Sequence, residues 1–321
     1  MADGVSSKKI KAPNNRTLDT DVKEGKKYLK QCLKPGRKQL TAEEIRDRVI
    51  LGDSFKVMGK LPKESFDLII ADPPYNLTKN FGGKIFGKRS RDEYEKFTEK
   101  WLVPALELLK PTGSMYVCCD WKSSMIIGGI LAEHAYVRNR ITWQREKGRG
   151  AARNWKNGLE DIYFVTKSED YTFNLEAVKI RRRVMAPYRE NGVPKDWQEA
   201  ENGKGFRDTC PSNFWDDITV PFWSMPENTP HPTQKPEKLI AKLILASSNE
   251  GDTVFDPFLG SGTTAVAAKK LGRHFVGIEE SEQYCIFSQM RLERAERDKE
   301  IQGFSDGVFW ERNSKPGGKC R

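Results

Sequence analysis

Apolar positions along the chain follow two kinds of pattern. Short apolar runs bounded by polar residues predict seven buried strands, at 48–51, 66–71, 114–119, 138–143, 161–166, 253–255 and 274–278. Apolar residues at helical spacing predict helices at 94–108, 123–133, 236–248 and 282–299, with a further one ending at 271. Pro111 and Gly113 are expected to end the first helix. Strands that alternate with helices predict an α/β fold with a mostly parallel, seven-stranded sheet.

The regular pattern stops between residues 168 and 230. Arg, Lys and Trp are interleaved there with Gly, Pro and Asn, without any period. This mixture is typical of a surface that reads nucleic acid, and the alternative is an irregular lobe whose tryptophans form a small core. We interpret 168–230 as an insertion that combines the two. Residues 1–40 are predicted to form a mobile or loosely packed basic arm, and 301–321 a tail.

The chain of 321 residues carries a formal net charge of +10 and has a pI near 9.2. This excess favours an anionic partner, nucleic acid before a membrane surface, although a basic surface can also serve solubility alone. No apolar stretch is long enough to cross a bilayer, and residues 1–40 lack the apolar centre of a signal peptide. We therefore expect a cytoplasmic protein without a membrane partner.

The six cysteines and three histidines show no metal-binding spacing such as CxxC. We expect reduced, mostly structural thiols and no metal cofactor. Cys118 and Cys119 are consecutive in a predicted strand, so their side chains are expected to point to opposite faces of the sheet.

Asp72-Pro73-Pro74-Tyr75 directly follows the apolar run 66–71. An acid at the carboxyl end of a buried strand lies where open α/β sheets bind their ligands. Pro74 holds Pro73 extended and has no N–H, so the Pro73 carbonyl can point outward as a hydrogen-bond acceptor. A carboxylate, a carbonyl and an aromatic ring in succession suit a planar group that carries an NH2. The alternative is a turn that only ends the strand.

A second motif, G-x-G-x-x-A, runs from Gly260 to Ala265 between a predicted strand and a predicted helix. Glu279 ends the next strand at roughly the ~20-residue spacing of a dinucleotide-binding fingerprint. The glycines let the turn approach a ligand, and the acid can bind two ribose hydroxyls, so the pattern predicts an adenosine-containing cofactor. No Gly-Lys-Ser/Thr follows, as it would in a nucleoside-triphosphate loop. Asp53, at another strand end, could accept from an adenine amino group or cap a turn.

The two motifs lie far apart in the sequence, but each follows a predicted strand. In a doubly wound, Rossmann-like sheet the first strands of the two halves are neighbours. If these two strands are those neighbours, the acid for an amino group and the ribose site meet at one edge. The sequence therefore predicts that substrate and cofactor bind side by side there.

Together with His231-Pro-Thr-Gln-Lys-Pro236, these motifs resemble those of the DNA amino-methyltransferases, which transfer a methyl group from S-adenosylmethionine to adenine N6 or cytosine N4. Asp72 to Tyr75 precede the insertion and Asp256 to Thr264 follow it, which is the order of the permuted beta group of restriction-modification enzymes. The resemblance covers residues 46–295 except most of 168–230.

The resemblance also divides the chain and implies roles for its residues. The implied parts are a basic N-terminal arm (1–40), a catalytic half (41–167), a target-recognition insertion (168–230), a cofactor-binding half (231–300) and a C-terminal tail (301–321). The implied catalytic residues are Asp72, Pro73, Pro74 and Tyr75. The implied cofactor residues are Asp53, Asp72, Thr233, Lys235, Asp256, Pro257, Phe258, Gly260, Ser261, Gly262, Thr263 and Glu279, with Thr233 and Lys235 near the cofactor carboxylate. Basic residues of the insertion and nearby loops are expected to contact DNA, namely Lys88, Arg89, Arg149, Arg153, Arg181, Arg182, Arg183 and Arg189.

The implied reaction is methylation of N6 on a flipped adenine at a short site in double-stranded DNA, because the family uses Asp-Pro-Pro-Tyr mainly for adenine. Methylation of cytosine N4 is the first alternative and RNA methylation the second. Cytosine C5 methylation needs a cysteine nucleophile, typically in Pro-Cys, and this chain has only the reverse order, Cys210-Pro211. An NAD-dependent oxidoreductase would leave Asp72 to Tyr75 unexplained, and a non-catalytic DNA-binding regulator would leave the glycine turn unexplained. A homodimer and a cognate restriction endonuclease stay open as partners.

Overall fold

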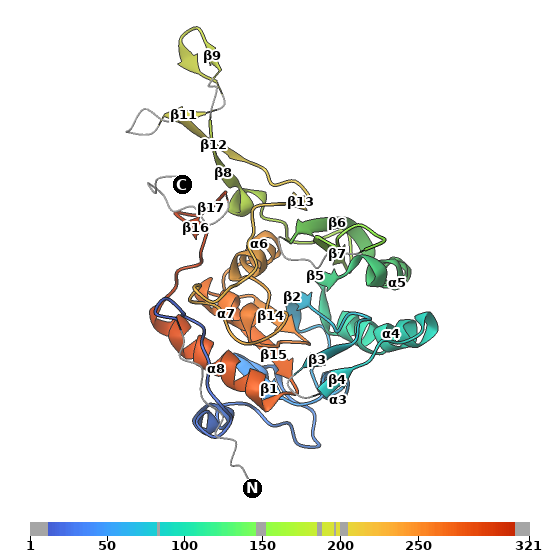
Figure 1. Ribbon diagram of the computed structural model, residues 1–321. Helices are drawn as coiled ribbons and strands as arrows, with labels where there is room; N and C mark the ends of the chain where they lie inside the picture. The colour runs from blue at the N-terminus through green and yellow to red at the C-terminus, as the bar shows by residue number, and fades with distance from the viewer. Residues whose placement is uncertain are drawn as a thin grey trace.

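The computed structural model describes residues 12–81, 84–145, 152–184, 188–195, 197–199 and 205–311. In this part of the chain the main sheet has eight strands (Figure 1). Their order is β1 (Arg48–Leu51), β15 (His274–Glu279), β14 (Thr253–Asp256), β2 (Phe66–Ala71), β5 (Leu109–Cys119), β7 (Leu159–Thr166), β6 (Tyr136–Gln144) and β13 (Phe214–Trp215). Neighbours pair in parallel except at β7, which runs antiparallel to β5 and β6. The predicted mostly parallel α/β sheet of seven strands is confirmed, and β13 adds an eighth at its edge.

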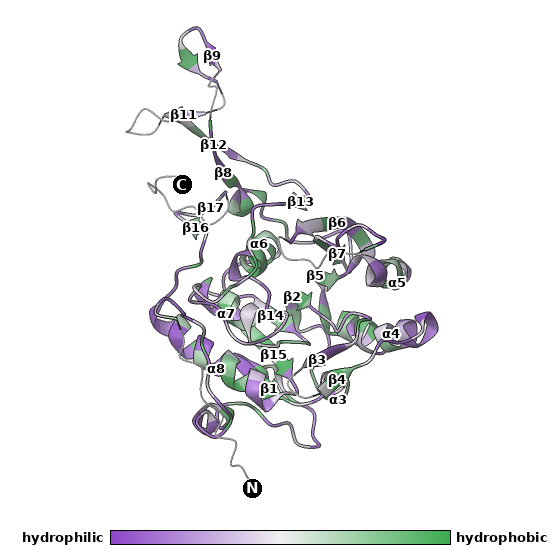
Figure 2. Cartoon of the chain, in the orientation of Figure 1, coloured by the Kyte–Doolittle hydropathy of each residue, from purple (hydrophilic) through white to green (hydrophobic). Residues whose placement is uncertain are grey.

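Side chains of the central strands alternate between two hydrophobic cores, one on each face of the sheet. Ile70 and Cys118 lie in the first core and Ile69 and Cys119 in the second, so the two cysteines point to opposite faces as predicted. Figure 2 shows the apolar residues along these strands. The helices of the first core are α6 (Glu237–Ser247), α7 (Thr263–Lys270) and α8 (Glu282–Arg297), and those of the second are α3 (Ser54–Met58), α4 (Arg91–Leu108) and α5 (Trp121–His134).

Local sequence fixes the start of α4. A capping box begins the helix, since the Ser90 hydroxyl accepts from the Glu93 N–H (3.3 Å) and the Glu93 carboxylate accepts from the Ser90 N–H (2.9 Å). The helix ends at Leu108, and Pro111 and Gly113, which were predicted to end it, lie inside β5. Among the described helices, none has both the length and the apolarity to cross a bilayer.

The insertion forms a lobe that projects beyond the main sheet (Figure 1). It contains a short turn of 3-10 helix, η1 (Leu175–Val178), and a hairpin of β9 (Arg189–Glu190) and β10 (Val193–Pro194). Its five-stranded sheet has the order β11 (Gln198–Glu199), β12 (Gly205–Thr209), β8 (Ile180–Arg183), β17 (Val308–Trp310) and β16 (Phe304–Ser305). Residues 304–310, which sequence reasoning placed in the tail, therefore complete the sheet of the insertion.

A buried ion cluster joins this lobe to α6. The Asp217 carboxylate accepts from Lys238 and from Lys242, both at 2.8 Å. Burial alone would raise the pKa of Asp217, but the two ammonium groups outweigh it and lower that pKa. Burial lowers the pKa of Lys242 to about 8. Because removal of one partner leaves a buried charge without compensation, this cluster fixes the lobe on the main sheet.

The described part of the N-terminal arm is packed against the rest of the chain. It contains α1 (Lys26–Leu29) and is followed by α2 (Ala42–Ile45). The N–H groups of Arg16 and Leu18 donate to backbone carbonyls of the 223–228 segment at 2.7 and 2.8 Å, and Leu33 extends the main sheet beside β1. Isolated backbone hydrogen bonds, which leave no periodic pattern in the sequence, thus hold residues 12–40 although most of these residues are exposed or half-buried, and the basic arm stays a prediction. Residues 1–11 lie outside the described range.

Candidate active site

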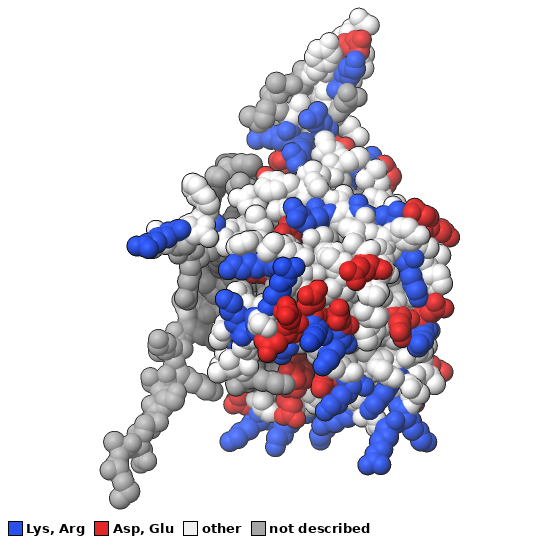
Figure 3. Space-filling model, turned by 90° about the vertical axis from the view of Figure 1, so that its right-hand side faces the viewer, with Lys and Arg blue, Asp and Glu red and all other residues white. Residues whose placement is uncertain are grey.

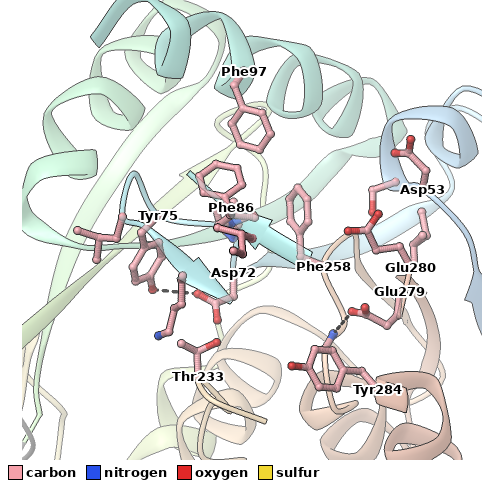
Figure 4. A pocket seen from close by; sticks show the side chains of 18 of the residues that line it. Asp53, Asp72, Tyr75, Phe86, Phe97, Thr233, Phe258, Glu279, Glu280 and Tyr284 are labelled. Carbon is pink, nitrogen blue, oxygen red and sulfur yellow. Dashed lines mark hydrogen bonds between the residues drawn. The ribbon is translucent and has the colours of Figure 1, made fainter. Parts of the chain in front are cut away.

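The two sequence motifs meet at the carboxyl edge of the main sheet. Strands β2 and β14 are adjacent and parallel, with Ile69 paired to Phe255, so the residues that follow both strands lie at the same edge. A cavity of about 380 Å³ opens there, a volume typical of small-molecule sites. It is lined by Asp72 to Tyr75 from the first motif and by Gly260 and Glu279 from the second (Figure 4). The predicted meeting of the two motifs is therefore confirmed.

The turn between β14 and α7 needs glycine at two positions. Gly260 and Gly262 have φ values of 55° and 86°, in the left-handed region that other residues rarely adopt. A Cβ on Gly262 would lie 2.8 Å from Ser288 of α8, and one on Gly260 would lie 3.0 Å from the His231 ring. Because glycine has no side chain, the turn can lie against Ser288 and His231 without projecting into the cavity that it borders.

Asp256 holds this turn from within. Its carboxylate accepts hydrogen bonds from the Phe258 N–H (2.8 Å) and from the Thr264 hydroxyl (2.6 Å), and burial raises its pKa to about 7. Phe258 and Gly260 line the cavity. The other turn residues that sequence reasoning linked to the cofactor lie behind this surface, namely Asp256, Pro257, Ser261, Gly262 and Thr263.

Glu279 and Asp53 line the cavity from the ends of two neighbouring strands. The two oxygens of Glu279 accept the N–H groups of Gly260 and Ser281, each at 2.8 Å, which fixes the carboxylate in place. Burial raises the pKa of Glu279 to about 7 in spite of these hydrogen bonds. Asp53 caps α3 by accepting from the Phe55 N–H at 3.0 Å. The capping role is therefore observed, and the same carboxylate faces the cavity (Figure 4).

Asp72 is held by two donors. One carboxylate oxygen accepts from the Tyr75 hydroxyl at 2.9 Å, and the other accepts from the Lys235 ammonium at 2.6 Å. The Lys235 ammonium group contacts Asp72 and Glu160, and its place near the cofactor carboxylate stays a prediction. Thr233, predicted for the same place, does line the cavity.

Residues 66–290 match the DNA methylase family of N6/N4 methyltransferases. The chain belongs to this family. It is 35% identical over 260 residues to the type II methyltransferase M.HpaI of Haemophilus parainfluenzae, covering 80% of this chain and 76% of that protein. It is also 35% identical over 254 residues to the DNA adenine methyltransferase YhdJ of Escherichia coli (strain K12), covering 77% and 83%. The crystal structure of the M1.HpyAVI–SAM complex aligns with a TM-score of 0.52 at 26% identity, over 76% of this chain and 98% of that one.

This DNA methylase is thus an S-adenosylmethionine-dependent DNA amino-methyltransferase of the restriction-modification type, which confirms the predicted family, fold and cofactor. The cavity fits such a cofactor. Glu279 offers a fixed carboxylate to a ribose, the thin turn at Gly260 leaves room beside it, and Phe258 supplies an aromatic wall. When bound, S-adenosylmethionine supplies an electrophilic methyl group on a sulfonium sulfur.

A short hairpin of β3 (Lys79–Phe81) and β4 (Lys84–Phe86) covers one side of the cavity. Arg89 follows it, and its guanidinium lies 4.7 Å from the centre of the Phe86 ring and 4.3 Å from that of Phe97. The Asn76 side chain also bonds the Arg89 backbone, at 2.7 and 2.9 Å. Arg89, expected at DNA, is therefore placed as a stacked part of the cavity wall.

The other residues expected to contact DNA are spread over several surfaces. Lys88, Arg153, Arg182, Arg183 and Arg189 are exposed. In Figure 3, Lys and Arg side chains gather where the lobe joins the body. Arg181 is instead half-buried and bound to both carboxylate oxygens of Asp208, at 2.8 and 2.7 Å, with Phe206 below its guanidinium. Arg149 lies outside the described residues.

Sequence reasoning missed some residues of the site. Glu160 contacts Lys235 and Tyr75 beside Asp72, and its only signal was an acid at the start of an apolar strand. His231 was quoted as part of a motif without a role. Its ring packs edge-on against Tyr284 at the cavity, and burial, followed by the charge of Lys235, lowers its pKa to about 3. The neutral ring accepts from the Thr233 N–H at 3.3 Å and so helps to place Thr233.

Proposed function

We propose that this enzyme methylates the N6 amino group of adenine within a short, specific site of double-stranded DNA. The observation that carries the proposal is the Asp72 carboxylate in the cavity that Gly260 and Glu279 also line. An aspartate in the first position of this tetrapeptide is the form that the family resemblance associates with adenine. The relative YhdJ is named a DNA adenine methyltransferase, which supports the same substrate. Cytosine N4 is the second candidate, because the family includes enzymes for both amino groups.

The site can make an adenine amino group nucleophilic. Its nitrogen lone pair is delocalised into the ring, and hydrogen bonds from its two N–H groups to Asp72 and the Pro73 carbonyl would favour a pyramidal nitrogen with a localised lone pair. Within the described part of the chain, the Pro73 carbonyl accepts no protein hydrogen bond, whereas the Tyr94 hydroxyl donates to the Pro74 carbonyl at 3.1 Å. Pro73 therefore has an acceptor to offer. The nitrogen would then bond to the methyl carbon as the bond between that carbon and the sulfonium sulfur breaks, and the methylated nitrogen would lose one proton to water, without a covalent enzyme intermediate.

The target base must leave the duplex to reach this cavity. Tyr75 is proposed to stack on the flipped base, because its hydroxyl is tied to Asp72 at 2.9 Å and to Glu160 at 3.2 Å. These bonds fix the ring relative to the carboxylate that receives the amino group. Tyr75 would thus orient the plane of the base, while Asp72 binds the edge of the base that carries the amino group.

We propose residues 168–230, completed by β16 and β17, as the target-recognition region between a catalytic half (41–167) and a cofactor-binding half (231–300). Arg182 on β8 and Arg207 on β12 are paired directly, so their side chains share one face of the lobe sheet, and both are exposed. Arg181 and Asp208 are paired on the opposite face. Arg182 and Arg207 are therefore our candidate pair for DNA contact on this sheet.

The double variant Arg182→Glu/Arg207→Glu is expected to weaken binding to duplex DNA about 10-fold or more and to reduce its salt dependence. Fluorescence anisotropy over a range of KCl concentrations measures both effects. Arg181→Gln is the matched control on the same strand. It is expected to lower the melting temperature through the loss of its bond to Asp208 while changing DNA affinity much less. Unchanged affinity in the double variant would remove this face from the DNA contact.

Mapping of methylated positions tests the proposed function directly. Plasmid DNA from a strain without methyltransferases is incubated with the enzyme and S-adenosylmethionine and sequenced by a method that distinguishes N6-methyladenine from N4-methylcytosine. The expected result is N6-methyladenine at one short motif. Methylation confined to cytosine would favour the second candidate, and incorporation only into RNA would exclude DNA as the substrate.

Cofactor binding is expected to strengthen as the pH rises through about 7. The pKa of Glu279 is raised by burial to about 7, so the carboxyl is largely protonated at pH 6 and ionised at pH 8.5. Only in the ionised form can both oxygens, each of which already accepts one backbone N–H, accept a further hydrogen bond from a ribose hydroxyl. Calorimetry with S-adenosylhomocysteine should show about 10-fold tighter binding at pH 8.5 than at pH 6. Glu279→Gln should bind more weakly and without this dependence; a wild-type affinity independent of pH would contradict the ribose role.

A further inference from the structure

Four charged side chains, Asp72, Glu160, Lys235 and Arg145, form a cluster at the wall of the cavity, and the reaction outlined above uses only Asp72. Lys235 lies 2.6 Å from one oxygen of Asp72 and 3.3 Å from Glu160, and its side chain is 7% exposed. The Glu160 side chain on β7 is 4% exposed and is also paired with Arg145. Two carboxylates and two cations thus balance one another in a place with little solvent, where an unpaired charge would be costly.

The hydrogen bonds of Lys235 show where its charge acts. An ammonium group has three donors, and the Lys235 nitrogen has three acceptors within reach. These are Asp72 at 2.6 Å, Tyr75 at 3.2 Å and Glu160 at 3.3 Å. Two of these groups, Asp72 and Glu160, belong to the cluster, and Lys235 itself is not among the residues that line the cavity in the described chain. The Lys235 charge therefore acts on Asp72 and Glu160, the two carboxylates that it contacts.

We propose that Lys235 and Glu160 are positioning residues that keep Asp72 ionised and aimed at the target amino group. The inference rests on the proposed function, in which Asp72 accepts a hydrogen bond from that group. An ionised carboxylate only accepts, whereas a protonated one would present an O–H to an NH2 that also donates. Lys235 supplies the compensating charge, and Glu160, 3.3 Å from the Lys235 nitrogen, holds Lys235 in place.

Lys235 stays charged in this environment. Burial alone would lower its pKa, but Asp72 and Glu160 outweigh burial and raise it. The charged or titratable groups that face Asp72 are Tyr75, Lys79, Cys118, Arg145, Glu160, Lys235 and Asp256. Burial raises the pKa of Tyr75 and Cys118 well above their ordinary values, so both are neutral near pH 7. Among the cations of this group, Lys235 is the one in direct contact with the Asp72 carboxylate.

Three variants separate this role from a purely structural one. Lys235→Met leaves Asp72 and Glu160 with one cation fewer, so one carboxyl takes up a proton. Its kcat is expected to fall about 100-fold at pH 7 and to recover toward the wild-type value as the pH rises to 9. Glu160→Gln keeps the ammonium group at Asp72, so its smaller loss of kcat should be the same at every pH. Lys235→Arg keeps the positive charge and should not gain the pH dependence.

Two readouts do not depend on methyl transfer. In Lys235→Met the folded state binds an extra proton, so the deficit in melting temperature relative to wild type should widen as the pH rises from 6 to 9. The melting-temperature deficit of Glu160→Gln should not widen as the pH rises. Affinity for S-adenosylhomocysteine, measured by calorimetry, should stay within about threefold of wild type in Lys235→Met, because Lys235 contacts Asp72 and is not among the residues that line the cavity.

Either of two results would overturn the inference. In the first, neither the ratio of the Lys235→Met kcat to the wild-type kcat nor the melting-temperature deficit of Lys235→Met changes with pH. The other is a loss of more than about 10-fold in cofactor affinity with an unshifted pH profile, which would return Lys235 to the cofactor carboxylate. If the wild-type enzyme methylates no exocyclic amino group, the proposed function fails, and the melting temperatures alone then decide whether Lys235 sets the charge of Asp72.

Discussion

Asp72→Asn is expected to lower kcat about 1000-fold while affinity for duplex DNA and S-adenosylhomocysteine changes by less than about threefold. The amide has nearly the size of the carboxylate, so the cavity keeps its shape. It lacks the negative charge that stabilises positive charge developing on the attacking nitrogen, and its own NH2 can face the target amino group. Lys235, 2.6 Å away, would also lose an ionic partner. Single-turnover methyl transfer to a defined duplex measures the chemical step apart from product release.

Glu99→Gln is the matched control for Asp72→Asn. Glu99 is exposed on α4 and also loses one negative charge, so a change of net charge alone would affect both variants equally. We expect Glu99→Gln to retain wild-type turnover. An Asp72→Asn enzyme with wild-type turnover would remove Asp72 from the chemistry, and one that no longer binds DNA would make Asp72 a binding residue instead.

The edge where the chemistry takes place could be predicted because its determinants are local. Asp72 and Gly260 each follow a short buried strand, and parallel strands of one sheet direct their carboxyl ends to one edge. The left-handed backbone at Gly260 and Gly262 likewise belongs to the motif itself. Periodicity and turn chemistry therefore sufficed for the sheet, the cofactor turn and the acid beside them.

The partners of charged side chains could not be predicted, because they come from distant parts of the chain. Lys235 was linked to the cofactor by its motif alone, yet Glu160 on β7 supplies the second carboxylate that places it under Asp72. Arg181 and Arg182 appeared equivalent in the sequence. In the structure, pairing with β12 brings Asp208 beside Arg181 and leaves Arg182 exposed. Strand alternation gives the face of a residue but not which strand lies next to it.

The strands near the C-terminus were missed for a similar reason. Phe309 pairs in parallel with Ile180 and is fully buried, although the segment around it contains only a short apolar run among Gly and polar residues. A strand of three residues has no period to detect. Residues 304–310 were therefore assigned to a tail because their apolar run is too short to predict a strand. The pairing of β17 with β8 is visible only in the three-dimensional structure.

Gly262→Ala is expected to destabilise the fold by about 2–5 kcal/mol and to abolish measurable cofactor binding. The residue has a φ of 86°, and the added Cβ would lie 2.8 Å from the Cα of Ser288, which is backbone and cannot rotate away. Helix α8 or the turn must shift. The Ser288 hydroxyl donates to the Gly260 carbonyl at 3.0 Å, so either shift displaces the turn that borders the cavity. Urea unfolding measures the stability and calorimetry the binding of S-adenosylhomocysteine.

Gly251→Ala is the matched control, because it separates backbone strain from the clash. Gly251 has nearly the same φ, 84°, but a Cβ there would meet no atom within 4 Å. Gly251→Ala should therefore lower the free energy of unfolding only by the strain of an alanine in the left-handed region, about 1–2 kcal/mol. It should leave cofactor binding unchanged. The difference between the two variants measures the packing of the turn against α8. Equal stabilities, with cofactor bound equally well, would mean that the turn can relax away from Ser288 and that its close approach to α8 does not shape the site.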